Sequence, residues 1–357
     1  MTDESHTNFT RVKFLSRQNP RVWRRQLPNQ SEVWSGCKFI FDTEETNYDW
    51  LVVYDDLPPS AGERRPIRTE TLSCPRGQTI LVTSEPSSIK SYFTDYTDQF
   101  GFVMTSQPHW ALPHRGHLYQ QPALQWFYGI GSSDEIPFHE LEKSVTGQKI
   151  GLVSAVGSGK RQTHTLHHAR FEFLQALKER CPQIDFFGRE DTLIDDKAEA
   201  VRPYFFHLAV ENYIGPHHWT EKLADCFLGE AVPLYVGCPN IADYFPKESF
   251  IALDINNIKE AEKIINNLTV EDYQRRLPAL KEAKRRVLYQ YNIFSEISKI
   301  IEYSTVSTRI ATASGGKILS RKALQKSSLL LSCKHLYQKL RLRVLHKVKG
   351  RASVDRI

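Results

Sequence analysis

Short apolar runs alternate with polar stretches along most of the chain. In the first half these runs are rich in β-branched and aromatic residues, and each is followed by a polar or Pro-containing loop. Such runs are typical of strands buried on both faces of a parallel sheet. The expected strands are residues 38–42, 50–56, 79–85 and 100–106, with a helix over residues 87–100.

The alternation restarts at residue 149. We expect strands over residues 149–156, 184–188, 204–211, 232–237 and 249–254. The expected helices are residues 165–181, 220–229, 257–268 and 269–291. Two successive blocks that alternate in this way predict an α/β fold with two Rossmann-like domains facing a cleft. We place the first domain at residues 1–145, the second at 146–305, and a linker with a basic amphipathic tail at 306–357.

The composition is that of a globular protein, with 40% hydrophobic and 25% charged residues. The opening stretch MTDESHTNFTRVKF has no apolar run, so we expect neither a signal peptide nor a transmembrane anchor there. Six cysteines are scattered without a C-x-x-C pair. This favours reduced thiols in the cytoplasm over a zinc ribbon or a disulfide scaffold.

The charge is unevenly distributed. Residues 317–351 contain 11 Lys or Arg and no acid, so the rest of a chain whose net charge is +6 carries −5. The stretch TASGGK at 312–317 predicts a flexible linker, and the Leu, Tyr and Val residues after it are spaced for an amphipathic helix. A basic amphipathic helix suits an anionic membrane surface. We therefore expect a peripheral contact through 317–351 on the inner face of a membrane; a solvated tail and a nucleic-acid-binding arm are the alternatives.

A glycine-rich stretch, GLVSAVGSGKRQT at 151–163, raises the question of a phosphate-binding P-loop. That motif needs Gly, four residues, then Gly-Lys and a hydroxyl residue that binds magnesium. Ser154 stands at the first Gly position and Arg161 at the hydroxyl position, while Lys160 fits. Two of the four positions fail, which disfavours a P-loop.

Most of the candidate chemistry lies in residues 204–254. A buried strand is expected to end at Glu211-Asn212, and Thr220-Glu221-Lys222 opens a helix. A helix N-terminus attracts anions through its free N–H groups and its dipole. Lys222 adds a full charge suited to a diphosphate, and Glu221 can accept hydrogen bonds from two ribose hydroxyls. Open α/β sheets bind ligands at this carboxyl edge.

This segment resembles the donor-binding motif of the family 10 fucosyltransferases, the α-1,3/α-1,4 enzymes that use GDP-fucose. The matching positions are Glu211-Asn212, Thr220-Glu221-Lys222, Val232-Pro233, Gly237-Cys238-Pro239-Asn240 and Phe250-Ile251. His218 stands where the family often has Tyr. In the family, the helix after the strand GLVSAV carries an Arg that binds the diphosphate, and Arg170 takes that position here. The resemblance thus implies a sugar-donor site of Arg170, Asn212, His218, Glu221 and Lys222.

The first half resembles the bacterial branch of the same family. There a Glu that follows a strand is the proposed general base, and Glu85 in TSEP takes its place. An inverting transfer needs a carboxylate to accept the proton of the attacking hydroxyl. Asp55 and Asp56, at another strand end, are the rival carboxylates.

No metal or cofactor is expected to be required, and a divalent metal would at most stimulate. Enzymes of the two-Rossmann-domain (GT-B) type neutralise the leaving diphosphate with Arg, Lys and helix dipoles. The histidines in HTLHH and PHHW could suggest metal ligands, and hydrogen-bonding loop residues are the alternative.

The hypothesis is a fucosyltransferase-like enzyme that transfers fucose from GDP-fucose to a hydroxyl of a glycan acceptor, with no nucleic-acid partner. One alternative is another GDP-hexose or a non-sugar acceptor. Another is a nonenzymatic glycan- or membrane-binding protein with the same fold.

Overall fold

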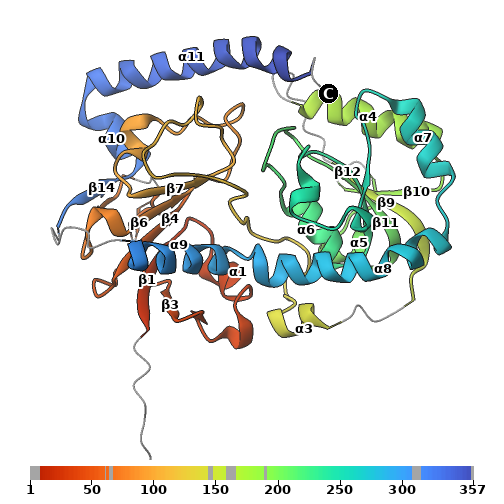
Figure 1. The fold of residues 1–357 in the computed structure, drawn as a ribbon, viewed down its shortest axis with the longest axis horizontal. Coiled ribbons are helices and arrows are strands. Elements are labelled where there is room, and N and C mark those ends of the chain that lie inside the picture. Colours follow the sequence, from red (N-terminus) through yellow and green to blue (C-terminus); the bar gives the residue numbers. More distant parts are fainter. Residues whose placement is uncertain are drawn as a thin grey trace, which may run out of the picture. The chain divides into compact units, whose positions relative to one another are not determined.

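The computed structural model describes residues 9–60, 62–63, 67–143, 148–157, 166–188, 191–307 and 315–354. The chain divides into two compact units, one of Met1–Pro122 with Phe294–Ile357 and the other of Ala123–Ile293. Each unit contains a mainly parallel sheet with helices (Figure 1). The expected α/β class with two Rossmann-like domains is confirmed. The first unit ends at residue 122 rather than 145, and residues 294–357 group with it.

The first unit is built on a seven-stranded sheet of order β2-β3-β1-β4-β6-β7-β8. Every pair is parallel except the antiparallel pair β2–β3. The strands are β1 (Thr10–Leu15), β2 (Val33–Trp34), β3 (Cys37–Ile40), β4 (Trp50–Tyr54), β6 (Thr79–Val82), β7 (Phe102–Thr105) and β8 (His117–Tyr119). All four strands expected in this half are confirmed. The helix expected over 87–100 is wrong for most of its length, because only α2 (Thr94–Thr97) forms and hydrogen bonds to other elements hold the preceding loop.

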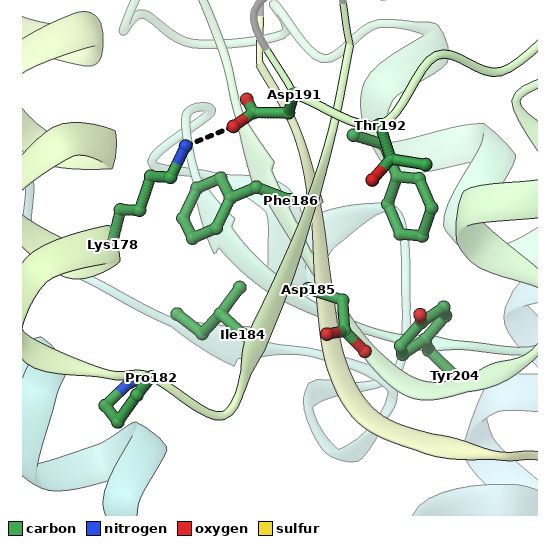
Figure 2. A pocket seen from close by; sticks show the side chains of 9 residues that line it. Lys178, Pro182, Ile184, Asp185, Phe186, Asp191, Thr192 and Tyr204 are labelled. Carbon is green, nitrogen blue, oxygen red and sulfur yellow. Dashed lines mark hydrogen bonds and ion pairs between the residues drawn. The ribbon is translucent and has the colours of Figure 1, made fainter.

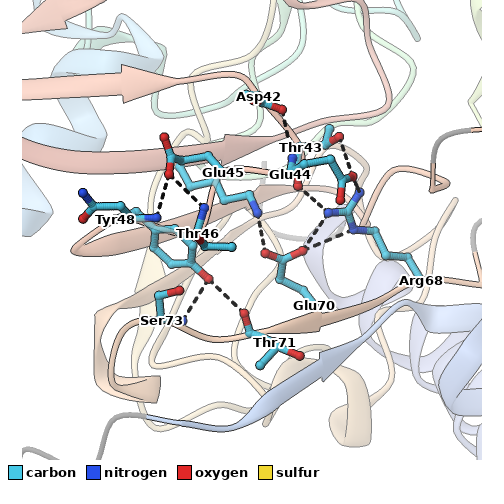
Figure 3. Close-up of polar contacts among 12 residues, drawn as sticks. Asp42, Thr43, Glu44, Glu45, Thr46, Tyr48, Arg68, Glu70, Thr71 and Ser73 are labelled. Atoms are coloured by element: carbon cyan, nitrogen blue, oxygen red, sulfur yellow. Dashed lines mark hydrogen bonds and ion pairs between the residues drawn. The ribbon is translucent and has the colours of Figure 1, made fainter.

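Strand β1, which the sequence did not reveal, lies in the interior of this sheet with a lysine in its middle. Lys13 is 2% exposed, and its ammonium lies 2.5 Å from Oε1 of Glu70 on β5 (Thr69–Thr71). Glu70 also accepts from the guanidinium of Arg68 at 2.9 Å, and Arg68 reaches the backbone carbonyl of Thr43 (Figure 3). A buried lysine needs such partners because an unpaired charge in the core is costly.

The C-terminal segment returns to this network. Strand β14 (Lys317–Leu319) pairs antiparallel with β5, so that Ile318 joins the hydrophobic core of the first unit. Helix α10 (Arg321–Ser327) follows, capped by Ser320, whose backbone N–H donates to the carbonyl of Arg68 at 2.9 Å. The expectation that this whole segment is linker and tail is therefore wrong for residues 317–327. Most of the expected linker lies outside the described residues.

Helix α11 (Leu329–Val354) also packs on the first unit. The His335 imidazole stacks on the Phe93 ring with centroids 3.8 Å apart, and Lys334 pairs with Asp95 at 2.6 Å. Among the described residues, no helix is both long and apolar enough to cross a membrane.

Phe294 packs against aromatic residues of β1 and β3 in the first unit. This ring lies 4.7 Å from Phe39 and 5.8 Å from Phe14 between centroids. The remaining helices of the first unit are α1 (Pro20–Arg24) and α9 (Ile293–Ser307), with 3-10 turns at Pro28–Gln30 and Arg76–Gln78.

The second unit has an all-parallel sheet of order β10-β9-β11-β12-β13. Its strands are β9 (Gly151–Val156), β10 (Ile184–Phe187), β11 (Tyr204–Val210), β12 (Val232–Val236) and β13 (Ile251–Ala252). Its helices are α3 (Phe138–Glu142), α4 (His167–Arg180), α5 (Ala198–Val201), α6 (Glu221–Leu228), α7 (Ile258–Asn266) and α8 (Val270–Arg285), with a π turn at Arg286–Gln290 and 3-10 turns at Ile241–Asp243 and Lys247–Ser249. The strands and helices expected after residue 149 are confirmed.

Candidate active site

Two neighbouring strands of the second sheet end side by side. Val210 on β11 is paired with Val236 on β12, and the backbone N–H of Glu211 donates to the Val236 carbonyl at 2.8 Å. Gly237 then makes a close approach that only glycine permits. A Cβ there would lie 2.3 Å from the Tyr235 hydroxyl oxygen and 2.6 Å from Cγ of Glu211. The Gly237 turn therefore leaves room for the Glu211 side chain at the carboxyl edge.

Glu211 fixes the start of α6. Its Oε1 accepts from the backbone N–H of Thr220 at 2.8 Å, and its Oε2 accepts from the Thr220 hydroxyl at 2.7 Å. Thr220 is in turn the N-cap of α6, and its Oγ1 accepts from the backbone N–H of Lys222. Glu211 is fully buried, and burial raises the pKa of its carboxyl despite the opposing effect of Lys222. The strand end and the helix start are thus joined through one carboxylate.

The predicted residues Glu221 and Lys222 lie on the first turn of α6. The Lys222 ammonium is 2.9 Å from Oε1 of Glu221 and 3.6 Å from Oε2 of Glu211. Burial opposes ionisation of Glu221, but Lys222 and Lys197 outweigh it and lower its pKa to about 2. Burial also opposes the charge on Lys222, yet the two glutamates raise the pKa of Lys222 above its usual value. Both side chains are 18% exposed, so this ion pair is charged and partly accessible to solvent.

Arg170 belongs to the same electrostatic group, from α4. Burial lowers the pKa of its guanidinium, and the charges of Glu211 and Glu221 oppose that shift. Its Nη2 donates to the carbonyl of Val156, the last residue of β9, at 3.4 Å. Its Nε is buried and has no hydrogen-bond partner in the described part of the chain. The structure therefore brings Arg170 to the carboxyl edge that carries Glu221 and Lys222.

The other two predicted residues of the donor site flank this group. Asn212 follows Glu211 directly, and its Oδ1 is a buried acceptor without a partner among the described residues. His218 is 2% exposed, and its ring meets that of Tyr213 edge to face at 5.2 Å. Burial, aided by the charge of Lys222, lowers the pKa of His218 to about 3, so the imidazole is neutral. Buried polar atoms without partners are rare in folded proteins and often mark the position of a ligand or water.

Lys160 and Arg161, on which the P-loop question depends, lie outside the described residues, as does His164. Groups of three or more His, Cys, Asp or Glu side chains that could hold a metal ion do not occur in the part of the chain that the structure describes. The independence from metal stays a prediction.

Glu85 lies in the first unit, on the half-buried loop that follows β6. The rival carboxylates are both engaged with cations. Asp55 hydrogen-bonds to Lys90, Tyr92 and Ser84, while Asp56 pairs with Arg17 and accepts from two backbone N–H groups. Their lone pairs are therefore committed to structural contacts.

A surface pocket of about 580 Å³ lies beside the edge strand β10 (Figure 2). Among the described residues that line it, Lys178 is the sole cation, and it pairs with Asp191. Asp185 adds a second carboxylate near Tyr204. This lining does not suit a diphosphate, and it contains none of the predicted site residues.

Sequence reasoning missed the parts that Glu211 and Thr220 play in the site. Both residues belong to the matching motif, and a Thr directly before Glu-Lys at a helix start is a signal for an N-cap. That the cap is held by a buried carboxylate at the end of a strand could not be read from spacing.

The comparisons with known proteins agree with this location. Residues 148–276 match the family model described as "Glycosyltransferase family 10 (fucosyltransferase) C-term". This segment contains the sheet edge and the α6 N-terminus described above. The expected resemblance to family 10 is thus confirmed over these residues.

Two curated relatives resemble parts of the chain. An α-(1,3)-fucosyltransferase of Helicobacter pylori is 26% identical over 147 residues, which cover 41% of this chain and 29% of the relative. A putative fucosyltransferase-like protein of Arabidopsis thaliana is 33% identical over 104 residues, 28% of this chain and 20% of the relative. The chain therefore spans less than a third of the length of the curated relatives that it matches.

Among solved structures, an α1,3-fucosyltransferase is 17% identical with a TM-score of 0.48, over 87% of this chain and 93% of that one. A structure of α1,3-fucosyltransferase with GDP-fucose is 15% identical with a TM-score of 0.47, over 87% of this chain and 94% of that one.

Proposed function

We propose that the protein is an inverting glycosyltransferase that transfers fucose from GDP-fucose to a hydroxyl of a glycan acceptor. The observation that carries the proposal is the α6 N-terminus, where Lys222, Glu221 and Arg170 gather within the segment that matches the family model. The two curated relatives, named as an α-(1,3)-fucosyltransferase and a putative fucosyltransferase-like protein, support fucosyl transfer.

The donor would bind through charge. Lys222 and Arg170 supply two cations near the positive end of the α6 helix dipole, an arrangement that attracts a diphosphate. A guanidinium can bind two phosphate oxygens at once, and the Nε of Arg170, which has no hydrogen-bond partner among the described residues, is suited to this. Glu221 stays ionised and can accept hydrogen bonds from ribose hydroxyls. As the bond to fucose breaks, the same cations would stabilise the charge that develops on the leaving GDP.

The acceptor hydroxyl needs a base, and we assign this part to Glu85. Its carboxylate would accept the proton while the hydroxyl oxygen attacks the anomeric carbon on the face opposite to GDP. Inversion follows from this single displacement. The rivals Asp55 and Asp56 hold the structure of the first unit through Tyr92 and the backbone of Arg321.

Isothermal titration tests the donor, and a transfer assay tests the reaction. We expect GDP and GDP-fucose to bind, UDP to bind more weakly, and fucose transfer to a glycan acceptor to continue in EDTA. An absence of GDP binding would refute the proposed site. Binding of GDP with transfer from another GDP-hexose would keep the site and change the donor sugar.

We also infer a peripheral membrane contact through α11. Six large apolar side chains on this helix are exposed by 50–88%: Leu329, Leu330, Leu336, Tyr337, Leu340 and Val344. His335 and Leu342, on the opposite side of the helix, are buried. Lys339, Arg341 and Arg343 are exposed beside the apolar residues. An apolar stripe flanked by cations suits the headgroup region of an anionic bilayer.

A further inference from the structure

Asp55 holds both ends of the loop between β6 and α2, which carries Glu85. Asp55 stands at the end of β4 in a left-handed conformation, with φ of 69°, which is strained for a non-glycine residue. Its carboxylate accepts from the Ser84 hydroxyl at 2.9 Å and also from Lys90 and Tyr92. The two ends of the loop around Glu85 are thus tied to one carboxylate.

Gln107, which follows β7, holds the backbone of the same loop. The Gln107 side chain is 1% exposed and donates from Nε2 to the carbonyls of Glu85 at 2.8 Å and Lys90 at 3.0 Å. A glutamine amide has two hydrogens, so both are used on this loop. The position of the Glu85 backbone therefore depends on contacts from outside the loop.

A third contact comes from the C-terminal segment. Arg321, the first residue of α10, donates from Nη2 to the carbonyl of Ser91 at 2.9 Å. Its guanidinium lies over the rings of Tyr92 and Phe93, 5.4 and 5.5 Å from their centroids. The Tyr92 hydroxyl donates to Asp55 and so anchors the loop, and Arg321 packs against the ring of this same Tyr92.

Arg321 is itself firmly placed. Its backbone N–H donates to Oδ1 of the buried Asp56 at 3.0 Å, and Ser320 before it exchanges hydrogen bonds with the backbone of Arg68. Arg68 belongs to the buried ionic network around Lys13 and Glu70 (Figure 3). Arg321 is therefore anchored to the core of the first unit by residues far from it in the sequence. Arg68 and Ser320, for example, are 252 residues apart.

We propose that Arg321 is a positioning residue for the loop that carries Glu85. In this proposal β14 and α10 not only attach the C-terminal segment to the first unit but also support catalytic turnover. The inference rests on the proposed function in one respect, which is that Glu85 is the general base. In this proposal Arg321 acts through its contacts with Ser91, Tyr92 and Phe93.

The test compares Arg321→Ala with Arg321→Lys and with Lys326→Ala. Lys326 lies on the same helix and is exposed, so its removal costs the same charge without touching the loop. Hydrogen exchange of residues 84–93 is measured together with kcat, KM for GDP-fucose and GDP affinity. For Arg321→Ala we expect faster exchange in this loop, kcat lower by about 10–100-fold, and GDP affinity within about twofold of the parent. Arg321→Lys should be intermediate, because an ammonium keeps the charge but not the planar stacking.

Unchanged loop exchange or unchanged kcat in Arg321→Ala would overturn the proposal. So would a parallel loss of kcat, GDP affinity and thermal stability, since that pattern marks general destabilisation. If Arg321→Ala cannot be purified, Arg321→Lys carries the same test. If the parent enzyme does not transfer fucose, the proposed function fails, and the exchange measurement still decides whether Arg321 holds the loop.

Discussion

Thr220 donates two hydrogen bonds to the single carboxylate of Glu211, one from its backbone N–H at 2.8 Å and one from its hydroxyl at 2.7 Å. Only a carboxylate presents two acceptor oxygens in this geometry. Glu211→Gln should therefore cost about 1–3 kcal/mol of folding stability, because one buried donor of Thr220 loses its acceptor. It should also weaken GDP binding by loosening the α6 N-terminus.

Urea unfolding and GDP titration measure both effects of Glu211→Gln. Glu271→Gln on the first turn of α8 is the matched control, since that carboxylate is exposed. Parent-like stability of Glu211→Gln would show that the two bonds to Thr220 do not matter for folding.

Removal of either candidate cation should weaken GDP binding. Lys222→Ala and Arg170→Ala each delete a charge-assisted contact worth about 1.5–3 kcal/mol, which is roughly 10–150-fold in affinity. Isothermal titration gives the affinity. Lys178→Ala removes a cation from α4 beside the β10 pocket and should bind GDP like the parent. Affinity within about twofold of the parent in both test variants would exclude them from the site.

Replacement of Glu85 should separate binding from chemistry. Glu85→Gln keeps the size of the side chain but cannot accept a proton at neutral pH, so kcat should fall by roughly 10²–10⁴-fold while GDP affinity is kept. Asp98→Asn, at an exposed carboxylate of the same unit, is the control. Weaker GDP binding with an unchanged kcat would instead assign Glu85 a structural part.

The low pKa of Glu221 predicts a loss of stability in acid. Its folded pKa of about 2 lies below the usual value, so the stabilisation is complete above about pH 5 and is lost as the pH falls toward 2. Below about pH 4 the loss approaches 1.4 kcal/mol per pH unit. Glu221→Gln does not titrate there, so its stability deficit relative to the parent should shrink on acidification. Unfolding curves from pH 6 to 3.5 measure this, and a constant deficit would contradict it.

The apolar stripe of α11 should decide membrane binding. Leu336→Ser with Leu340→Ser should reduce co-sedimentation with anionic vesicles, and added salt should release the parent protein. Deletion of residues 329–357 should abolish binding, whereas deletion from residue 317 would also remove β14 from the core. Retention of the parent in the supernatant at low salt would refute the contact, and a stripe-dependent dimer would indicate a second copy as the partner.

The sequence predicted the second unit well because its signals are local. Each strand there is an apolar run, and Thr220-Glu221-Lys222 marks both a helix start and the candidate site. The first unit depends on distant partners instead. Strand β1 is not recognisable from its sequence because it contains Lys13. A lysine inside a buried strand is acceptable only when a residue such as Glu70, distant in the sequence, supplies the opposite charge. Ile318 likewise sits in a basic stretch whose composition indicates a tail, although it is fully buried.

The pairing of β14 with β5 has a consequence for biosynthesis. Residues 123–293 form a continuous unit that can fold once they have left the ribosome. The core of the first unit includes Ile318, so this core cannot be completed until residue 318 has also left the ribosome, after the whole second unit. Domains usually fold in the order in which they emerge. Here the second unit can fold first. Until β14 has been synthesised, β5 lacks this partner strand and has an edge that a chaperone or another nascent chain could bind.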